Sequence, residues 1–259
     1  MYQTNRYFTS IILSTFICIY LASSSILAGF SVNLKDRIID LKKGSQSTSL
    51  QLSNNGENPI AIDVRIMRAT FDSYGKESQD EIGEDLFLVY PNQLILMPGE
   101  TEFTKISWLG PSDLESEVMF RVVSSETPLN LQPNTPTEDN PDGRTGRVSV
   151  LLRYVNSLFI KPDNALANLE LLPFELKTND VGDTVLRFTL LNKGNSHISP
   201  KSLEFFVTDT ATKEEKVFQY EDYVLLLPNS KRYCDFVLKD NGKSLSKNAK
   251  FTYKTLDDL

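Results

Sequence analysis

The chain has 259 residues, of which 40% are hydrophobic and 24% are charged, a composition typical of a globular protein and not of a disordered one. The formal net charge of −7 argues against a nucleic-acid-binding protein, and one histidine, His197, cannot build a multi-histidine zinc site. Two cysteines are too few for a disulfide-dense secreted scaffold.

The first 28 residues are typical of a secretory signal peptide. Arg6 precedes the apolar stretch IILSTFICIYLA, and small residues follow as far as Ala28. The apolar stretch is shorter than the ~20 residues that cross a bilayer, so a membrane anchor is the less favoured alternative. We expect cleavage after Ala28 or one residue later. Cleavage would leave Cys234 as the last cysteine, without a disulfide partner in the same chain.

A first block of strands is predicted after the leader, because apolar and polar residues alternate there with a period of two. The segments FSVNLKDRIIDL, STSLQLSN and IAIDVRIMRA show this alternation and are separated by turn residues. The charged segment YGKESQDEIGED is expected to be a surface loop. It is followed by the strand candidates DLFLVYP, NQLILMPGE, TEFTKISW and SEVMFRVV. We find no segment with a helical apolar period, so a β-sandwich or barrel is indicated.

The alternation stops at residues 125–146, which contain four prolines and few apolar residues. Such a loop inside a compact domain is usually functional or disordered. The longest strand candidate of the chain, RVSVLLRYVNSLFI, follows at once and ends at Lys161 and Pro162. Its 14 residues exceed the usual strand length, so part of it is expected to bend or to pair outside its own sheet.

A second block of strands begins with NLELLPFELKT and includes TVLRFTLLNKGN, SLEFFVTD, KVFQYED, YVLLLPNSKRYCDFVL and KFTYK. We therefore expect a signal peptide at residues 1–28 and two all-β domains at residues 29–162 and 163–259. The segment LSNNG in the first block is echoed by LLNKG in the second, which suggests two related sandwiches. Cys234 alternates with polar neighbours and is interpreted as a packing residue of a strand.

The order of these motifs resembles the periplasmic chaperones of chaperone–usher pilus assembly. The resemblance is carried by VNLKDRIIDL, SLQLSNNGENPIAIDV, YPNQLILMPGETEFTKISW, EVMFRVV, RVSVLLRYVNSLFIKP, LRFTLLNKGNSHIS and YVLLLPNSKRY, and it covers nearly the whole chain after the leader. RYVNSLF is closer to the divergent, archaic branch of the family. The resemblance implies two immunoglobulin-like β-sandwich domains in an L-shaped arrangement.

The resemblance also implies a function. Family members bind pilus or fimbrial subunits in the periplasm, stabilise them by donor-strand complementation and deliver them to an outer-membrane usher. A donor strand needs a row of apolar side chains directed at the subunit. On this strand the row is expected to be Val148, Val150, Leu152 and Tyr154. Ser149 and Leu151, of opposite parity, are expected to face the core of the chaperone.

Two basic residues in the family anchor the C-terminal carboxylate of the subunit. The best match on the first strand is Arg37. On the last strand, counting back from Pro162 places Ser157 or Asn156 where the family has a lysine, and Arg153 is the nearest cation. We therefore expect Arg37 and Arg153 to form the anchor, although both are also compatible with solvated strand charges.

Lys161 corresponds to a basic residue that pairs with acids across the two domains of the family. An interdomain role is therefore expected for Lys161, with an ordinary surface ion pair as the alternative. Enzymatic function is not expected. His197 lies in a turn without a neighbouring nucleophile, and no pair of acids is singled out by its spacing.

The sequence predicts no cofactor, no metal site and no nucleic-acid partner. Subunits and the usher are the expected partners, and a dimer that caps its own exposed strands is left open. The alternative from another functional class is a secreted β-sandwich adhesin or structural pilus component, which would receive a strand instead of donating one. Two domains without a disulfide favour the chaperone.

Overall fold

The computed structural model describes residues 29–44, 46–80, 85–129, 150–209, 212–238 and 249–256. The expected signal peptide, most of the proline-rich loop, and Val148 lie outside these described residues. Strands dominate the described part, beside the short 3-10 helix η1 (Leu41–Lys43). The expectation of an all-β chain built from sandwiches is confirmed.

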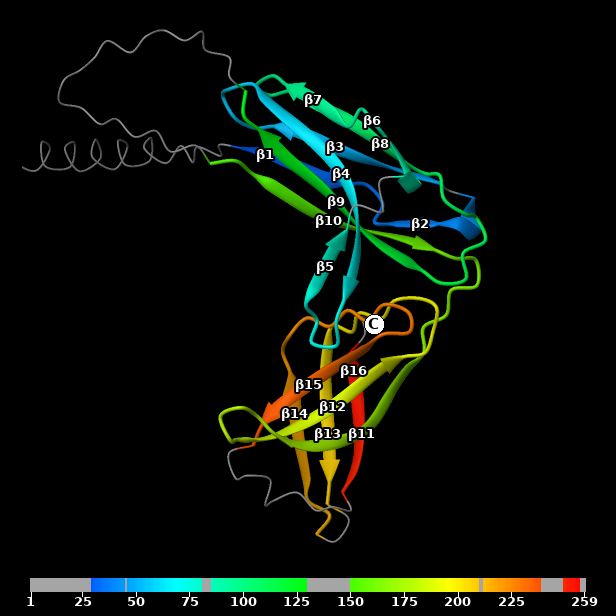
Figure 1. Ribbon diagram of the computed structural model, residues 1–259, viewed down its shortest axis with the longest axis vertical. Coiled ribbons are helices and arrows are strands. Elements are labelled where there is room, and N and C mark those ends of the chain that lie inside the picture. Colours follow the sequence, from blue (N-terminus) through cyan, green and yellow to red (C-terminus); the bar gives the residue numbers. More distant parts are fainter. Residues whose placement is uncertain are drawn as a thin grey trace, which may run out of the picture.

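The N-terminal sandwich is formed by two sheets (Figure 1). The first sheet has the order β1 (Phe30–Leu34), β3 (Ser47–Asn54), β8 (Thr101–Trp108), β6 (Phe87–Tyr90). The second sheet has the order β2 (Ile38–Asp40), β10 (Arg153–Lys161), β9 (Val118–Thr127), β4 (Ile60–Phe71), β5 (Glu77–Asp80), and β7 (Gln93–Leu96) also pairs with β4. The chain thus changes sheets between β1 and β2.

The core between these sheets is made of alternate side chains of each strand. In β3, for example, Leu50 and Leu52 are fully buried while their neighbours are partly exposed. The rings of Phe87, Trp108 and Phe120 pack edge to face inside the sandwich, with the Phe87 and Phe120 centroids 4.9 Å apart. The period-two pattern therefore sets which face of each strand is buried.

The C-terminal sandwich consists of two three-stranded sheets (Figure 1). Their orders are β11 (Leu169–Thr178), β12 (Thr184–Asn192), β15 (Lys231–Val237) and β14 (Glu215–Tyr220), β13 (Ser202–Thr208), β16 (Lys250–Leu256). The rings of Phe188 and Phe205 stack across the interior at 4.4 Å. Cys234 is fully buried in this core, as expected for a packing residue.

An asparagine ends one strand in each sandwich and organises the following turn in the same way. Asn54 Nδ2 donates to the carbonyls of Asn58 and Leu96, and its Oδ1 accepts from the amide of Gly56. Asn192 likewise donates to carbonyls four residues on and across the sandwich, and accepts from the amide of Gly194. The echo between LSNNG and LLNKG therefore has a structural basis.

Three strand predictions need correction. The charged segment expected to be a loop contains β5, an edge strand whose polar side chains are mostly exposed and therefore carry no apolar alternation. The strand candidate before Pro162 is nine residues long in the described part and begins at Arg153. In YVLLLPNSKRYCDFVL only Lys231–Val237 is a strand, although Leu226 forms an isolated bridge with Ile198 and is buried.

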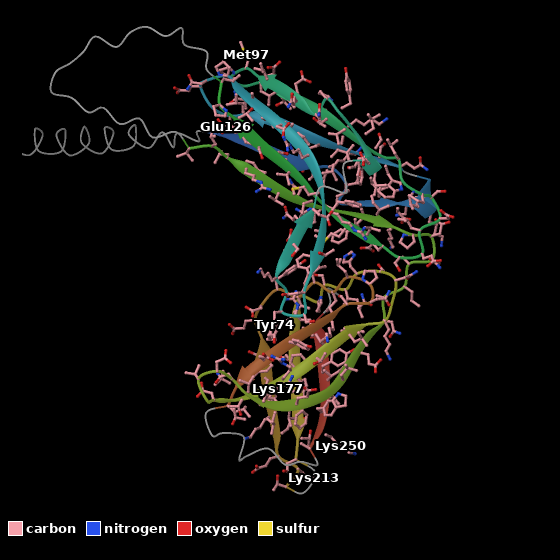
Figure 2. The ribbon with its side chains drawn as sticks, viewed as in Figure 1. Tyr74, Met97, Glu126, Lys177, Lys213 and Lys250 are labelled. Carbon is pink, nitrogen blue, oxygen red and sulfur yellow. The ribbon has the colours of Figure 1, made fainter. Side chains whose placement is uncertain are left out.

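The two sandwiches are set at an angle, and the β4–β5 hairpin extends from the N-terminal sandwich to the C-terminal one (Figures 1 and 2). The carbonyl of Ser73 accepts from the amide of Tyr233, and the carbonyl of Tyr74 accepts from Nη1 of Arg232. The Arg187 guanidinium lies 5.3 Å from the centroid of the Tyr74 ring. These contacts fix the tip of the hairpin on the second sandwich.

A small apolar cluster also joins the two sandwiches. Ala69, Met119 and Phe159 of the N-terminal sheet are buried together with Leu225 of the C-terminal sandwich. These three residues lie on the outer face of their sheet, because their neighbours Phe120, Leu158 and Ile160 point into the N-terminal core. The outer face near Met119 and Phe159 therefore faces the C-terminal sandwich.

Candidate functional site: the open edge of β10 and its basic neighbours

β10 has one fully paired edge and one edge that is mostly open. It pairs antiparallel with β9 from Arg153 to Ile160. On the other edge it pairs with β2, parallel, only from Phe159 to Lys161. Within the described part of the chain, no strand pairs with that edge at residues 153–158. An open strand edge presents backbone donors and acceptors to an incoming strand.

The segment leading into β10 exposes apolar side chains. Val150 is 72% exposed, Leu151 is 47% exposed and Val155 is 44% exposed. Val150 and Leu152 line a hollow of about 220 Å³ together with Asn58, Ile60 and Glu126. Glu126 lies at the end of the N-terminal sandwich remote from the C-terminal one (Figure 2). Val150 and Leu151 thus expose apolar side chains to water just before β10 begins.

The side chains of residues 151–154 do not point in the directions expected from the sequence. Leu152 packs against the N-terminal core, and the ring of Tyr154 meets Phe30 edge-on with centroids 4.8 Å apart. Leu151, expected to face the core, is exposed. Leu152 and Tyr154 therefore lie on the same side of the chain as Leu158 and Ile160, but Tyr154 remains 37% exposed and Val150, before the start of β10, is more exposed still.

Arg37 and Arg153 do not lie together. The carbonyl of Arg37 accepts from the amide of Phe159 at 2.8 Å, near the C-terminal end of β10. Arg153 is opposite Ser125, at the other end. Six residues of extended strand separate the two places by about 20 Å. The two expected anchor residues therefore lie near opposite ends of β10.

A different cation lies on β9, the strand that pairs with this part of β10. Arg121 on β9 is directly opposite Ser157, at the position where the family lysine was expected, and its Nη1 donates to the Ser157 hydroxyl at 2.5 Å. Arg37 precedes β2 on the other side of β10, about 10 Å from Arg121 by strand spacing. The sequence contains Arg121 in EVMFRVV, but it does not show that this segment pairs with β10, so Arg121 was not predicted as a site residue.

Arg121 is half-buried on the outer face of the sheet, the same face as Met119 and Phe159. Its Nε donates to Glu77 Oε1 at 2.9 Å, and its Nη2 pairs with Glu77 Oε2. The hydrogen bond from Arg121 lowers the pKa of Glu77 more than burial raises it. A guanidinium with two parallel donors is suited to bind a carboxylate in a bidentate manner. Arg121 is therefore a carboxylate-binding group that Glu77 occupies.

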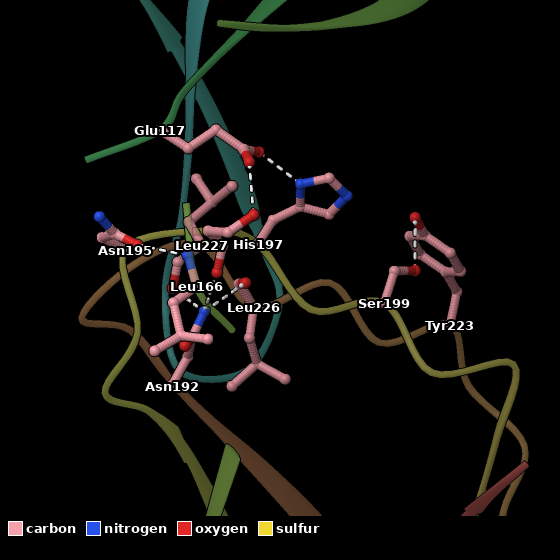
Figure 3. A network of polar contacts seen from close by, with 10 residues as sticks. Glu117, Leu166, Asn192, Asn195, His197, Ser199, Tyr223, Leu226 and Leu227 are labelled. Carbon is pink, nitrogen blue, oxygen red and sulfur yellow. Dashed lines mark hydrogen bonds and ion pairs between the residues drawn. The ribbon is translucent and has the colours of Figure 1, made fainter. Parts of the chain in front are cut away.

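A second polar network joins the two sandwiches (Figure 3). The fully buried Glu117 side chain accepts from the Ser196 hydroxyl at 2.8 Å and pairs with Nδ1 of His197. The His197 ring also stacks on Phe159 with centroids 4.2 Å apart. His197 is thus a structural residue of the interface, as its place in a turn suggested.

The ion pair expected for Lys161 is not among those of the described residues. The interdomain acid, Glu117, meets His197 instead, and Lys161 is half-buried at the end of β10. In the described part of the chain, no group of three or more His, Cys, Asp or Glu side chains is placed to hold a metal ion. No helix in that part is long and apolar enough to cross a membrane.

A family model described as pili and flagellar-assembly chaperone, PapD N-terminal domain, matches residues 31–166. This match covers more than half of the chain, and the fold has the two sandwiches and the open last strand described above. The chain therefore belongs to the family of pilus-assembly chaperones. A search of the curated proteins found no match.

Solved structures with the same fold include several pilus chaperone complexes. A chain of the CsuC–CsuE chaperone–tip adhesion subunit pre-assembly complex from the archaic Csu pili of Acinetobacter baumannii has a TM-score of 0.54 and 18% identity, over 86% of this chain and 91% of that chain. A chain of a chaperone–tip adhesin complex of CFA/I fimbriae has a TM-score of 0.53 and 14% identity, over 88% and 99%. A chain of the SafA pilin–SafB chaperone complex of Salmonella enterica has a TM-score of 0.51 and 15% identity, over 81% and 85%.

Proposed function

We propose that this protein is a periplasmic chaperone that binds pilus or fimbrial subunits by donor-strand complementation and hands them to an outer-membrane usher. The observation that carries the proposal is the open edge of β10 beside exposed Val150 and Val155. The similar solved structures include complexes of chaperones with a tip adhesin or a pilin, which suggests the class of ligand.

The proposed mechanism follows from what an incomplete subunit lacks. A sandwich without one strand exposes apolar side chains and unpaired backbone groups, and both invite aggregation. The backbone edge of β10 would supply the missing hydrogen bonds, and the row that includes Val150 would fill the groove. Because the contacts are backbone pairing and apolar burial, the donation needs neither a nucleotide nor a metal.

The terminal carboxylate of the subunit would bind at Arg121, with Arg37 nearby. A charge pair at the end of the donated strand fixes its register, because a slip by one residue moves the carboxylate away from the cation and turns the apolar row outward. Arg153, at the opposite end of β10, is left to solvent in this proposal.

The location and the limits of the domains are part of the same proposal. Residues 1–28 would direct the chain to the periplasm and be removed, and the domains would comprise residues 29–162 and 163–259. Lys161 and Pro162 would then form the end of the first domain. A self-capping dimer of the free chaperone would compete with the subunit for the β10 edge, and delivery to the usher would follow subunit binding.

Capture of subunits from a periplasmic extract tests the proposal. Co-expression with candidate pilins should let wild-type chaperone retain a small β-rich subunit, and Val150→Asp should reduce retention at least tenfold because a charge would enter the apolar groove. Val181→Asp is the matched control, since Val181 is 85% exposed on the other sandwich. Arg121→Ala should weaken retention by roughly 2–5 kcal/mol.

Either of two results would contradict the proposal. Wild-type protein that retains no subunit, even when candidate pilins are co-expressed, would favour a secreted β-sandwich adhesin or structural component. Equal retention of subunit by wild type and Val150→Asp would be consistent with a chaperone, but it would show that β10 is not the donor strand.

A further inference from the structure

Glu77 occupies the carboxylate-binding group of this protein in the absence of any subunit. Its two carboxylate oxygens accept from Nε and Nη2 of Arg121, which are the parallel donors of the guanidinium. The remaining nitrogen, Nη1, donates to Ser157. Glu77 therefore occupies the side-on pair of parallel donors of Arg121, and Ser157 takes one N–H of the third nitrogen.

Glu77 is also placed so that it can leave. It is the first residue of β5, a four-residue edge strand whose other side chains are exposed. Its carboxylate reaches Arg121 across β4. Gln79 Nε2 donates to Glu77 Oε1 at 2.5 Å, the oxygen that also accepts from Nε of Arg121. A rotation about the side-chain torsions of Glu77 would release Arg121 into a partly solvated space without breaking any strand pairing.

We propose that Glu77 is an internal competitor of the terminal carboxylate of the subunit, and that strand donation to the subunit displaces it from Arg121. This inference rests on the proposed function, and it adds a specificity rule. A carboxylate that brings no strand has to displace Glu77. It gains one ion pair with Arg121 and breaks another of similar strength, so it does not bind. A subunit gains strand pairing and apolar burial besides, and these tip the exchange in its favour.

Chemical labelling of the purified full-length protein tests the occupation of Arg121 without a subunit. Phenylglyoxal modifies accessible guanidinium groups, and mass spectrometry of peptides reports the rate at Arg121. We expect Glu77→Gln and Glu77→Ala to raise that rate severalfold, and acetate to protect Arg121 in these variants but not in wild type. Glu175→Gln is the matched control, because Glu175 pairs with Lys177 on the other sandwich.

An Arg121 labelling rate that is equal in wild type and in both Glu77 variants would overturn the inference. So would equal protection of wild type by acetate, since small carboxylates would then bind despite Glu77. The labelling rate of Arg187, which is paired with Asp235 on the C-terminal sandwich, is the internal reference for folding.

Subunit capture separates competition from simple positioning. If Glu77 competes, Glu77→Gln retains more subunit than wild type. If Glu77 only orients Arg121, the variant retains less, and the inference is overturned. Failure of every variant to retain a subunit would refute the proposed function instead, while the labelling experiment still decides whether Glu77 closes Arg121.

Discussion

Arg121 and Glu77 form an ion pair whose strength depends on pH. The pKa of Glu77 lies below its ordinary value of 4.5, mainly because Arg121 donates hydrogen bonds to its ionised form. A group whose pKa is lowered on folding adds stability above its unfolded pKa, and this contribution is lost as the pH falls through the folded pKa. Since the pair is partly exposed, the contribution is about 1 kcal/mol or less.

Replacing Glu77 by Gln should therefore lower the free energy of unfolding at pH 7 by about 1 kcal/mol or less. The difference from wild type should shrink toward zero as the pH falls through the folded pKa of Glu77, where the carboxylate becomes protonated in the folded state as well. Urea unfolding of both proteins at several pH values measures it. A difference that is independent of pH would mean that packing, not charge, connects Glu77 to Arg121.

Burial raises the pKa of the Cys234 thiol to about 12. The thiolate is the reactive form, so native Cys234 should resist a thiol reagent such as DTNB at pH 8. We expect modification of the Cys234 peptide to be at least a hundredfold faster in 6 M guanidinium chloride, a factor that reflects protection by burial. Rapid labelling of the native protein would indicate that the core around β15 opens easily.

At the level of residues, the sequence predicted the types of group in the site better than their arrangement. Val150, which was expected to face a subunit, is 72% exposed in the segment before β10. The sequence could not show that Leu152 packs against the N-terminal core, or that Arg153 lies at the end of β10 remote from Arg37. Both depend on where β10 passes the edge of the sandwich. Arg121 follows only from the pairing of β9 with β10, which one sequence does not contain.

Among the elements, β4 serves both sandwiches. Its first half pairs with β7, and its second half forms the hairpin with β5 whose tip lies on the C-terminal sandwich. Gly75 in that tip has a φ of 84°, and a Cβ atom there would come within 1.4 Å of Nη1 of Arg232. Glycine is thus required both by the backbone and by the close approach of Arg232.

Gly75→Ala should loosen the contact between the hairpin and the second sandwich. Gly182→Ala is the control, because Gly182 has a φ of 91° and no atom within 4 Å of its Cβ position, so it reports the backbone strain of roughly 1–2 kcal/mol alone. We expect a larger loss of stability in Gly75→Ala and a more open envelope in small-angle X-ray scattering. Equal effects of the two substitutions would show that Arg232 moves aside at no cost.

The polar elements were the hardest to predict. β5 has no apolar alternation, since it lies at the edge of the sheet with its side chains in water, and its pairing with β4 is what makes it a strand. The strand β3, which alternates regularly between buried and partly exposed residues, was predicted because burial on one face leaves a period of two in the sequence.

For the whole molecule, the angle between the sandwiches is held by a few contacts. Glu117 is buried and serves both Ser196 and His197 of the second sandwich, and the amide of Glu117 donates to the carbonyl of Asn195. A buried carboxylate of this kind fixes an orientation, because any other angle would leave it without hydrogen bonds.

Glu117→Ala should lower the stability by roughly 1–3 kcal/mol, since it leaves the polar groups of Ser196 and His197 without their partner. Calorimetry should show the two sandwiches unfolding at more widely separated temperatures. Glu115→Ala is the control, because Glu115 is exposed and contacts Asn195 only through its backbone carbonyl. If Glu117→Ala unfolds like wild type in calorimetry, the angle between the sandwiches is held instead by the apolar cluster of Met119, Phe159 and Leu225.

The order of strands along the chain determines how the N-terminal sandwich can be completed during synthesis. β10 lies between β2 and β9 in the sheet, but it follows both in the sequence. A molecule that has emerged from the ribosome or export channel only as far as Thr127 is therefore a sandwich short of one strand, with the edge of β9 open. Until Lys161 emerges, this protein thus lacks one strand of its own sandwich, which is the same unfinished state that it is proposed to relieve in others.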